Sequence, residues 1–409
     1  MDRTILHCDC NSFFASVECV YNPELLKVPM AVCGDPESRR GIILAKNELA
    51  KKCEVKTAET IWQAKKKCPD LVLVRPHYDA YEEFSKRVNE IYKRYTELVE
   101  PFGIDESWLD VTNSQMLFGN GKKIADEIRN AVKKEIGITI SVGVSFNKVF
   151  AKLGSDYKKP DATTVISHQN FKSLVWPLPV DALLYVGKSS REVFSKLGIK
   201  TIGDLANINE ELLTLKLGKM GLQLHSYANG EDNSEVASIY DKKEAKSVGN
   251  GMTFKRNLLG LEDISSGVLY LADTVAVRLR SHGYKCRTLS VSIKDPQFKT
   301  AQKQKTLELP TDLAKDIYDV SMEIISSFWD IKKPIRAITI SASHFDEGQA
   351  GKQLSLFYEE NDDLGYQKQK SIEDAMDGIR EKYGKKSISY AKILNNDIGI
   401  SPQNIEEKE

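Results

Sequence analysis

The alternation of strand-like and helix-like segments over about the first 165 residues constrains the fold of this chain most. Ile5–Cys8 is a short apolar run that predicts a buried strand, and Ser12 is a candidate cap for the amphipathic segment Phe13–Val20. In Tyr78–Leu98 the apolar residues recur every three or four positions, which predicts a long helix. Ile124–Ile136 repeats this spacing and predicts a second helix.

Two more strands are predicted at Ser107–Val111, between these helices, and at Ile138–Ser145, after them. Strands that alternate with helices along a chain form a sheet with the helices packed against it. We therefore expect an α+β fold over this part of the chain, with residues 21–73 as a compact insert.

The remaining residues divide into further parts. Residues 166–236 contain short helix-like segments joined by glycine turns, and a polar linker follows at residues 237–246. Residues 247–345 mix strand-like and helix-like runs, which predicts a separate α+β domain, and residues 346–409 form a polar, acidic tail with a short helix at Ile372–Lys382. The runs that predict the separate domain are strand-like at Leu289–Ile293 and Ala337–Ser341 and helix-like at Val268–Arg280 and Leu313–Phe328.

Composition excludes several classes of protein. The chain is 41% hydrophobic, which is enough to bury a core and too much for a disordered protein. The seven cysteines are an odd number without a Cys-x-x-Cys pair, so we expect neither disulfides nor structural zinc, but reduced thiols in a cytoplasmic protein. The polar His7 ends the first apolar run too early for a signal peptide, and no stretch approaches the roughly 18 apolar residues that span a membrane.

Three acidic residues stand at the ends of predicted strands. Asp9 ends the first strand, and Asp105 and Glu106 precede the strand at Ser107–Val111. Mg²⁺ prefers hard oxygen ligands and needs few protein carboxylates, and two such ions about 4 Å apart can stabilise both oxygens of a phosphoryl transfer. Taken singly, these residues fit a simpler interpretation better, with Asp105 and Glu106 as a polar turn and Asp9 as a helix cap, because Asp-Glu pairs are common; both interpretations stay open.

Three long motifs surround these acidic residues, in order along the chain. They are HCDCNSFFASVE at residues 7–18, GIDESWLDV at 103–111, and SVGVSFNKVFAKLGSD at 141–156, with Lys-Lys-Pro at 158–160. Over about residues 4–357 the chain therefore resembles the Y-family, or translesion, DNA polymerases of the bacterial polymerase IV and V branch.

The resemblance implies a right-hand polymerase of the α+β class with several domains. It implies a catalytic palm made of a sheet with helices, small fingers, a thumb of helix-hairpin-helix character, and an α+β little finger that binds DNA. The expected boundaries are residues 1–20 and 74–165 for the palm, 21–73 for the fingers, 166–236 for the thumb, 247–345 for the little finger and 346–409 for the tail.

The resemblance also assigns the residues of a catalytic site. Asp9, Asp105 and Glu106 match the family's catalytic, metal-binding carboxylates. The Cys10 carbonyl is a further expected ligand, and the expected cofactor is a pair of Mg²⁺ ions. Phe14 matches the steric gate, an aromatic ring that lies under the sugar and excludes a 2′-hydroxyl, whereas the adjacent phenylalanine is expected in the core.

The nucleotide-binding candidates are basic or amide side chains. Lys159 matches a lysine that reaches the triphosphate, and Lys46, Asn47 and Lys51 are the others. Lys51 stands where many relatives carry an arginine, so the bidentate geometry of arginine on phosphate is lost. Other departures are Asn11 for the second aspartate of Asp-x-Asp, Glu48 for a tyrosine near the triphosphate, and Tyr185 for the first glycine of the thumb's Gly-x-Gly turn.

A short apolar motif lies in the polar tail. Gln353, Leu354, Leu356 and Phe357 belong to the run QLSLF, which resembles the sliding-clamp-binding peptide of bacterial polymerases. An apolar peptide in a polar segment is typical of a docking sequence for a hydrophobic pocket. The alternative is a last strand of the little finger.

The expected function is template-directed DNA synthesis by a DNA-directed DNA polymerase, in which the primer 3′-hydroxyl attacks the α-phosphate of a dNTP and pyrophosphate leaves. The small fingers insert, and the lack of a segment for a proofreading exonuclease, predict a low-fidelity enzyme for translesion synthesis. Its expected partners are primer–template DNA, dNTP and the sliding clamp (beta subunit), with no membrane, and the chain is expected to be a monomer.

Two alternatives remain open at this point. One is a non-catalytic DNA- and clamp-binding protein that keeps the polymerase scaffold, which the departures at Glu48, Lys51 and Tyr185 raise. The other is a nucleotidyl cyclase, because these enzymes share a palm-like sheet with paired carboxylates. In a cyclase the little-finger-like domain and the QLSLF motif would have no use.

The distribution of charge along the chain supports DNA binding, although the total charge does not. With 58 Lys+Arg and 58 Asp+Glu the formal charge is zero, which by itself gives no reason to expect nucleic acid. Residues 242–344, however, carry a net charge of +6, and residues 345–409 carry −5. We therefore expect salt-sensitive DNA affinity in the little finger.

Overall fold

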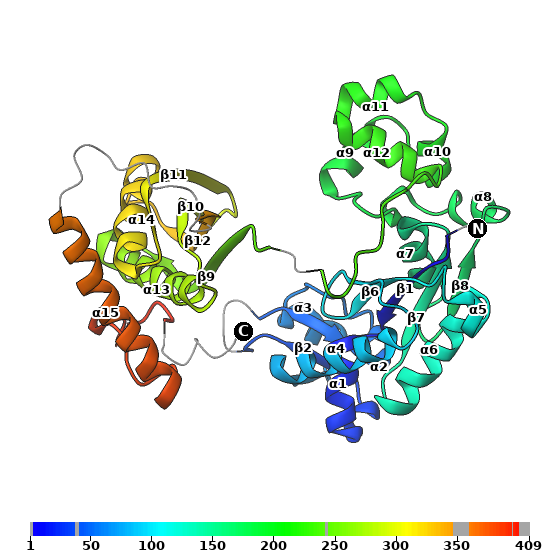
Figure 1. Ribbon diagram of the computed structural model, residues 1–409, viewed down its shortest axis with the longest axis horizontal. Helices are drawn as coiled ribbons and strands as arrows, with labels where there is room; N and C mark the ends of the chain where they lie inside the picture. The colour runs from blue at the N-terminus through cyan, green and yellow to red at the C-terminus, as the bar shows by residue number, and fades with distance from the viewer. Residues whose placement is uncertain (1–2, 37–40, 242–243, 347–359, 395, 401–409) are drawn as a thin grey trace. The chain divides into compact units, whose positions relative to one another are not determined.

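The structure is a computed structural model that describes residues 3–36, 41–241, 244–346, 360–394 and 396–400. The chain divides near residue 242 into two compact units, which are described separately. Figure 1 shows the order of their elements along the chain. Among the described residues, every helix is too short or too polar to cross a bilayer.

A five-stranded sheet forms the centre of the first unit, in the order β5-β6-β1-β7-β8. Neighbouring strands are antiparallel, except that β7 and β8 run parallel. The three strands predicted from the sequence are confirmed, with ends that differ by one or two residues. The strands are β1 (Ile5–Cys10), β5 (Val99–Pro101), β6 (Glu106–Asp110), β7 (Ile140–Ser145) and β8 (Thr163–Ile166).

Different helices cover the two faces of this sheet. Because side chains alternate along a strand, Leu6, Cys8 and Cys10 of β1 join a large apolar core with helices α1, α4 and α6. His7 and Asp9 point to the other face, where α7 packs. The helices are α1 (Phe13–Tyr21), α4 (Tyr78–Lys93), α5 (Gln115–Phe118), α6 (Gly121–Glu135) and α7 (Lys148–Tyr157).

Two helix ends differ from the sequence prediction. The helix that begins at Tyr78 ends at Lys93, because the chain then turns toward β5 and the Thr96 hydroxyl donates to the Asp110 carbonyl. Ser12 precedes α1 but does not cap it, since it adopts a left-handed backbone with φ 49° and its side chain makes no capping hydrogen bond. An N-cap side chain normally requires an extended backbone, so the capping prediction was wrong.

Two glycines allow α7 to lie directly on β7. A Cβ on Gly143 would lie only 1.9 Å from the Ala151 carbonyl oxygen and 2.4 Å from the Ser155 nitrogen, and Gly154 faces Gly143 from the helix. This close approach brings Ser155 and Lys152 of α7 within hydrogen-bonding distance of side chains on β1.

Gly143→Ala should therefore destabilise the first unit by about 3 kcal/mol or more, because the added methyl group meets backbone atoms that cannot rotate away. Urea unfolding followed by circular dichroism measures the effect. Gly187→Ala is the matched control, since a Cβ there meets nothing within 4 Å, and should change stability by no more than about 1 kcal/mol. Equal midpoints for both variants would contradict the packing of α7 described above.

Residues 21–73 fold around a small three-stranded sheet in the order β3-β2-β4. In it β2 is antiparallel to β3 and parallel to β4, and one apolar cluster is formed by this segment alone. The elements are η1 (Pro23–Leu26), β2 (Met30–Cys33), β3 (Ile43–Lys46), α2 (Glu48–Lys52), α3 (Ile61–Lys67) and β4 (Val72–Val74).

Short helices follow β8, as the glycine turns predicted. Phe194, Leu205 and Leu224 lie in the apolar cluster that holds these helices together. The helices are α8 (Phe171–Val175), η2 (Val180–Ala182), α9 (Lys188–Lys196), α10 (Ile202–Ala206), α11 (Glu210–Leu217) and α12 (Lys219–Ala228).

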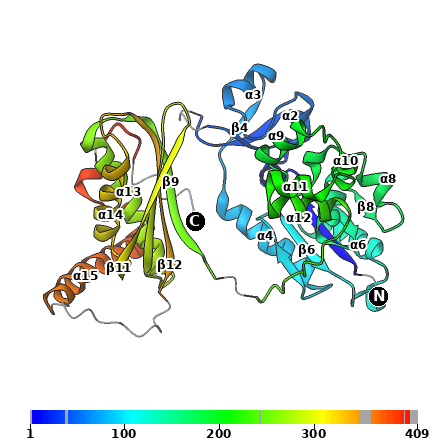
Figure 2. The same ribbon diagram turned by 90° about the horizontal axis from the view of Figure 1, so that it is seen from above.

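The second unit is built on a four-stranded antiparallel sheet in the order β11-β10-β12-β9. Figure 2 shows α13 and α14 on the same side of this sheet, where they bury the apolar side chains of β10 and β12. The strands and helices predicted here are confirmed; all are longer than expected except α14, which begins one residue later than predicted. They are β9 (Ser247–Leu258), α13 (Gly260–Ser281), β10 (Cys286–Lys294), β11 (Thr300–Thr311), α14 (Ala314–Phe328) and β12 (Ile335–Phe345).

The acidic tail contributes to the second unit. The predicted short helix is part of a longer one, α15 (Glu360–Tyr383), and η3 (Ala391–Ile393) follows it. Beyond α15, Ile393, Ile398 and Ile400 are buried in the core of this unit. The described tail therefore packs on the domain that precedes it.

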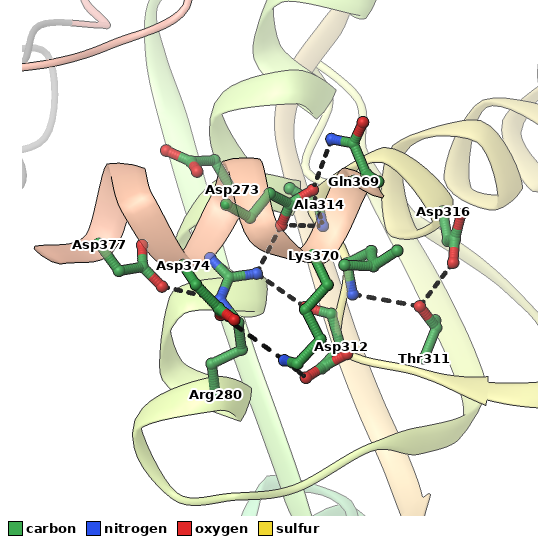
Figure 3. A network of polar contacts seen from close by, with 12 residues as sticks. Asp273, Arg280, Thr311, Asp312, Ala314, Asp316, Gln369, Lys370, Asp374 and Asp377 are labelled. Carbon is green, nitrogen blue, oxygen red and sulfur yellow. Dashed lines mark hydrogen bonds and ion pairs between the residues drawn. The ribbon is translucent and has the colours of Figure 1, made fainter. Parts of the chain in front are cut away.

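Charged side chains make the contact of α15 with this unit (Figure 3). Arg280 at the end of α13 reaches Asp377 at 2.7 Å, and Lys370 lies 2.8 Å from Asp312, just before α14. The Glu373 carboxylate, which is also buried, accepts hydrogen bonds from the Ala314 nitrogen at the first turn of α14. Charged side chains of α15 thus form ion pairs and hydrogen bonds with residues at the end of α13 and the start of α14.

Candidate active site

Strand pairing brings the three acidic residues to one place. Asp9 on β1 is directly opposite Glu106 on β6, and the Cys10 nitrogen donates to the Asp105 carbonyl at 2.9 Å. All four residues line a cavity of about 310 Å³. The strand ends therefore converge as the sequence suggested, and the Asp105 and Glu106 pair is part of this cavity wall and not an isolated polar turn.

Two lysines contact these carboxylates. Lys152 of α7 places Nζ 2.7 Å from Glu106 Oε2 and 3.4 Å from Asp9 Oδ2. Lys159, just beyond α7, places Nζ 2.7 Å from the same Asp9 oxygen. Lys159 is part of the cavity lining, and Lys152 reaches the same carboxylates from α7.

Burial and neighbouring charges shift the pKa values of the three carboxyl groups in different directions. Burial raises the pKa of Asp9 to about 6, against the opposing effect of Lys159. Burial, followed by repulsion from Glu106, also raises the pKa of Asp105. Burial acts in the same direction on Glu106, but hydrogen bonding and charge from His7 and Lys152 outweigh it and lower the pKa to about 2. Buried carboxylates that repel one another are the arrangement a divalent cation stabilises.

The chemistry of these donors fits Mg²⁺. As the side chains stand in the described part of the chain, no three His, Cys, Asp or Glu groups are close enough together to hold an ion by themselves. Mg²⁺ commonly takes one or two carboxylates and fills its other positions with water and substrate phosphates. Asp9, Asp105 and Glu106, with the Cys10 carbonyl nearby, therefore suit ions that bind together with a nucleotide.

The two phenylalanines at the start of α1 take different environments. Both line the cavity, but Phe13 is buried in the main core, as expected, whereas Phe14 is partly exposed. The Phe14 ring stacks on Tyr81 with centroids 4.1 Å apart and meets the edge of Tyr78 at 6.1 Å. These contacts hold the Phe14 ring in one orientation at the cavity wall.

Three of the four nucleotide-binding candidates line the same cavity, namely Lys46, Lys51 and Lys159. Lys46 Nζ donates to the Thr57 hydroxyl at 2.9 Å, and burial followed by the nearby charge of Lys51 lowers the pKa of Lys46. Lys51 Nζ lies 2.6 Å from Glu48 Oε1. Glu48, which stands where many relatives carry a tyrosine, thus forms an ion pair with Lys51, which stands where many relatives carry an arginine.

The fourth candidate, Asn47, makes hydrogen bonds to nearby backbone groups that stabilise the local fold. Its side-chain oxygen accepts from the nitrogens of Ala50 and Met30, and its amide donates to the carbonyls of Leu25 and Val28. The side chain thus caps α2 and ties it to the preceding loop, and it lies outside the cavity lining. We leave Asn47 out of the proposed nucleotide contacts for this reason.

The remaining sequence candidates are the four residues of the QLSLF motif and Tyr185. Gln353, Leu354, Leu356 and Phe357 fall outside the described residues. Tyr185, in the turn before α9, has a left-handed φ of 69° and is largely exposed. A glycine would adopt this backbone conformation without strain, so the tyrosine keeps the shape of the turn at an energetic cost.

Sequence reasoning missed two residues at the site. Lys152 stands one helical turn before Asp156 on α7, and its contacts with the carboxylates arise only because α7 packs on β1. His7 is fully buried beside Glu106, with Nε2 3.3 Å from Oε2. The one available signal was that a histidine interrupts an otherwise apolar strand.

Comparison with known proteins identifies the family. The model of the impB/mucB/samB family matches residues 8–156, and the model of its C-terminal domain matches residues 245–356. A solved structure of a Y-family DNA polymerase chimera superposes with a TM-score of 0.75 at 24% identity, over 84% of this chain and 99% of that one. This likeness confirms the multidomain α+β fold class.

Full-length relatives agree with the domain matches. DNA polymerase IV of Acetivibrio thermocellus is 48% identical over 98% of this chain and 100% of its own. DNA polymerase IV of Clostridium kluyveri is 35% identical over 96% and 99%, and that of Moorella thermoacetica is 36% identical over 96% of both. The chain therefore belongs to the impB/mucB/samB family, together with the bacterial DNA polymerase IV proteins that it matches over their full length.

Proposed function

We propose that this DNA-directed DNA polymerase adds nucleotides to a primer in the cavity lined by Asp9, Asp105 and Glu106, with two Mg²⁺ ions as cofactor. The observation that carries the proposal is that three carboxylates and the three lysines Lys46, Lys51 and Lys159 line one cavity of about 310 Å³. Primer extension with Mg²⁺ and dNTPs tests it. A nucleotidyl cyclase does not fit the family to which the chain belongs.

Some residues of the cavity would bind the metal ions, and others would bind the nucleotide. Asp9, Asp105 and Glu106 would hold the cations, which supply charge stabilisation for the attacking and leaving oxygens when bound. Lys159 and Lys46 would place positive charge near the triphosphate. Holding the primer 3′-hydroxyl next to the α-phosphate then accounts for much of the rate enhancement, because the two groups no longer have to meet by diffusion.

Phe14→Ala should allow ribonucleotides to be inserted. The ring is held against Tyr81 and lines the cavity, so a 2′-hydroxyl pressed against it would cost about 1–3 kcal/mol, or roughly fivefold to 150-fold in selectivity. Single-nucleotide insertion with matched dNTP and rNTP measures the ratio of kcat/KM for the two sugars.

Phe118→Ala is the matched control, since this phenylalanine lies on α5 and packs on Tyr95, outside the cavity lining. It should leave the ratio unchanged. If Phe14→Ala also leaves the ratio unchanged, Phe14 is not the group that excludes the 2′-hydroxyl.

The second unit presents a polar sheet face suited to DNA. On β10, Leu289, Val291 and Ile293 are buried toward the helices, while Ser290 and Ser292 point to the other face and are partly exposed. Small hydroxyl side chains can donate to phosphate oxygens without a clash. Together with the net charge of +6 over residues 242–344, this supports salt-sensitive DNA binding by the second unit.

We also infer recruitment by the sliding clamp and a role in low-fidelity translesion synthesis. Deleting residues 353–357 should leave extension of short primers unchanged but remove stimulation by the clamp, because tethering raises the local concentration of a weakly bound enzyme. Primer extension with and without the clamp measures both. Equal stimulation of the deleted and full-length chains would refute the role of this motif.

A further inference from the structure

His7 has no part in the proposed chemistry, yet it occupies a constrained position beside it. Its side chain is fully buried on the face of β1 that also carries Asp9. Its ring meets the Trp108 ring nearly edge-on, with centroids 5.3 Å apart, and Nδ1 lies 2.8 Å from the Ser155 hydroxyl. The imidazole is therefore fixed in place by contacts from β6 and α7.

The hydrogen bonds around the ring determine where its proton lies. The Ser155 hydroxyl is 2.8 Å both from His7 Nδ1 and from the Lys152 carbonyl, and it has one hydrogen to donate. If the hydroxyl donates to the Lys152 carbonyl, the ring hydrogen lies on Nδ1; if it donates to Nδ1, the ring hydrogen lies on Nε2. We assign the second arrangement, in which the hydrogen lies on Nε2, an atom without a hydrogen-bond partner within the described residues.

Nε2 faces a carboxylate oxygen. It lies 3.3 Å from Glu106 Oε2, a distance that a small movement would shorten to an ordinary hydrogen bond. The opposite tautomer would set a lone pair against an anion, so the charge on Glu106 favours the same assignment. Ser155, His7 and Glu106 thus form a directed chain from α7 to the cavity.

His7 and Lys152 contact the same Glu106 oxygen in different ways. Lys152 is cationic and is shared among Glu106, Asp9 and Asp156, at 2.7, 3.4 and 3.5 Å. A cation there opposes an incoming metal ion. His7 can act on Glu106 Oε2 through Nε2 alone, because its other ring nitrogen, Nδ1, is already within hydrogen-bonding distance of the Ser155 hydroxyl.

We propose that His7 is a positioning residue that holds Glu106 Oε2 through Nε2 and so turns the second oxygen, Oε1, toward a divalent cation. The inference rests on the proposed role of Glu106 as a metal ligand. Partners that orient a ligating carboxylate commonly change metal affinity or activity by about tenfold to 100-fold when they are removed.

Mn²⁺ binding tests this inference without relying on turnover. The sample is the full chain with primer–template DNA ended in a dideoxynucleotide and the matched dNTP, and free Mn²⁺ is counted by electron paramagnetic resonance. His7→Phe keeps the volume of the ring but lacks the donor, and should raise the Mn²⁺ dissociation constant about tenfold to 100-fold. His7→Gln offers an amide donor near the position of Nε2 and should recover most of the affinity.

Two further variants separate positioning from packing. Ser155→Ala removes the group that fixes the tautomer and should weaken Mn²⁺ binding in the same direction. The double variant H7F/E106Q should bind Mn²⁺ no more weakly than Glu106→Gln alone, because a residue that acts through Glu106 has no effect once that carboxylate is gone.

The outcomes are distinguishable. Wild-type affinity in His7→Phe, equal losses in His7→Phe and His7→Gln, or additive losses in the double variant would each overturn the positioning role while leaving the proposed function intact. If His7→Phe does not fold, Ser155→Ala decides, and wild-type affinity there overturns the role. If the wild-type complex binds no Mn²⁺, the metal site fails and the positioning role fails with it.

Discussion

Asp105→Asn and Glu106→Gln should each reduce nucleotide addition by about 10³-fold or more, while binding of primer–template DNA stays close to that of the wild type. Both substitutions keep side-chain size and remove the negative charge that a divalent cation needs. Loss of about 4 kcal/mol of charge stabilisation in the transition state corresponds to this factor. Single-turnover extension of a labelled primer, at enzyme concentrations that saturate the DNA, measures the chemical step.

Glu97→Gln is the matched control for these variants, because Glu97 is an exposed carboxylate that does not line the cavity. It should extend primers at the wild-type rate. Full activity in Asp105→Asn or Glu106→Gln would mean that the corresponding carboxylate is not a metal ligand in the reaction.

Arg380→Ala should destabilise the second unit by about 3–5 kcal/mol, because it leaves Asp273 as an unpaired buried charge. The two side chains are at most 9% exposed, and the guanidinium donates to both Asp273 oxygens at 3.1 and 2.8 Å. Burial already raises the pKa of Asp273 in spite of this pair, so the carboxylate depends on its partner. Urea unfolding, with a probe in the second unit, measures the loss.

Lys315→Ala is the comparison for this prediction. Lys315 pairs with Asp319 on α14, where both side chains are more than half exposed, and such pairs contribute no more than about 1 kcal/mol. Asp273→Leu combined with Arg380→Leu should recover much of the stability, since neither charge is then buried alone. An Arg380→Ala chain as stable as Lys315→Ala would show that α15 does not hold the unit together.

The sequence predicted that the three carboxylates lie together, because local patterns determine it. Asp9 ends an apolar run and Asp105 and Glu106 begin another, so strand pairing alone brings them together. Their proposed metal-binding role and the proposed role of Phe14 came from the resemblance of the motifs. The distinction between Phe13 and Phe14 also follows from a local rule, since adjacent residues on a helix face different directions.

The parts that the sequence did not predict depend on contacts between distant segments. Lys152 and His7 meet Glu106 only because Gly143 and Gly154 let α7 lie against the sheet. The packing of the acidic tail was not predicted, because composition cannot reveal that its charges pair with Arg280 and neighbouring residues. Ser12 failed as a cap because its backbone is left-handed, which no local rule indicated.

The central claim is that this chain performs template-directed synthesis in the cavity at Asp9, and single-nucleotide insertion opposite each of the four template bases tests it most directly. With Mg²⁺, the wild-type chain should add the complementary dNTP in preference to the other three, and Asp9→Asn should bind the same primer–template DNA but add none. Binding of primed DNA by the wild-type chain without any extension would contradict the account and would favour a non-catalytic protein on a polymerase scaffold. So would equal extension by Asp9→Asn.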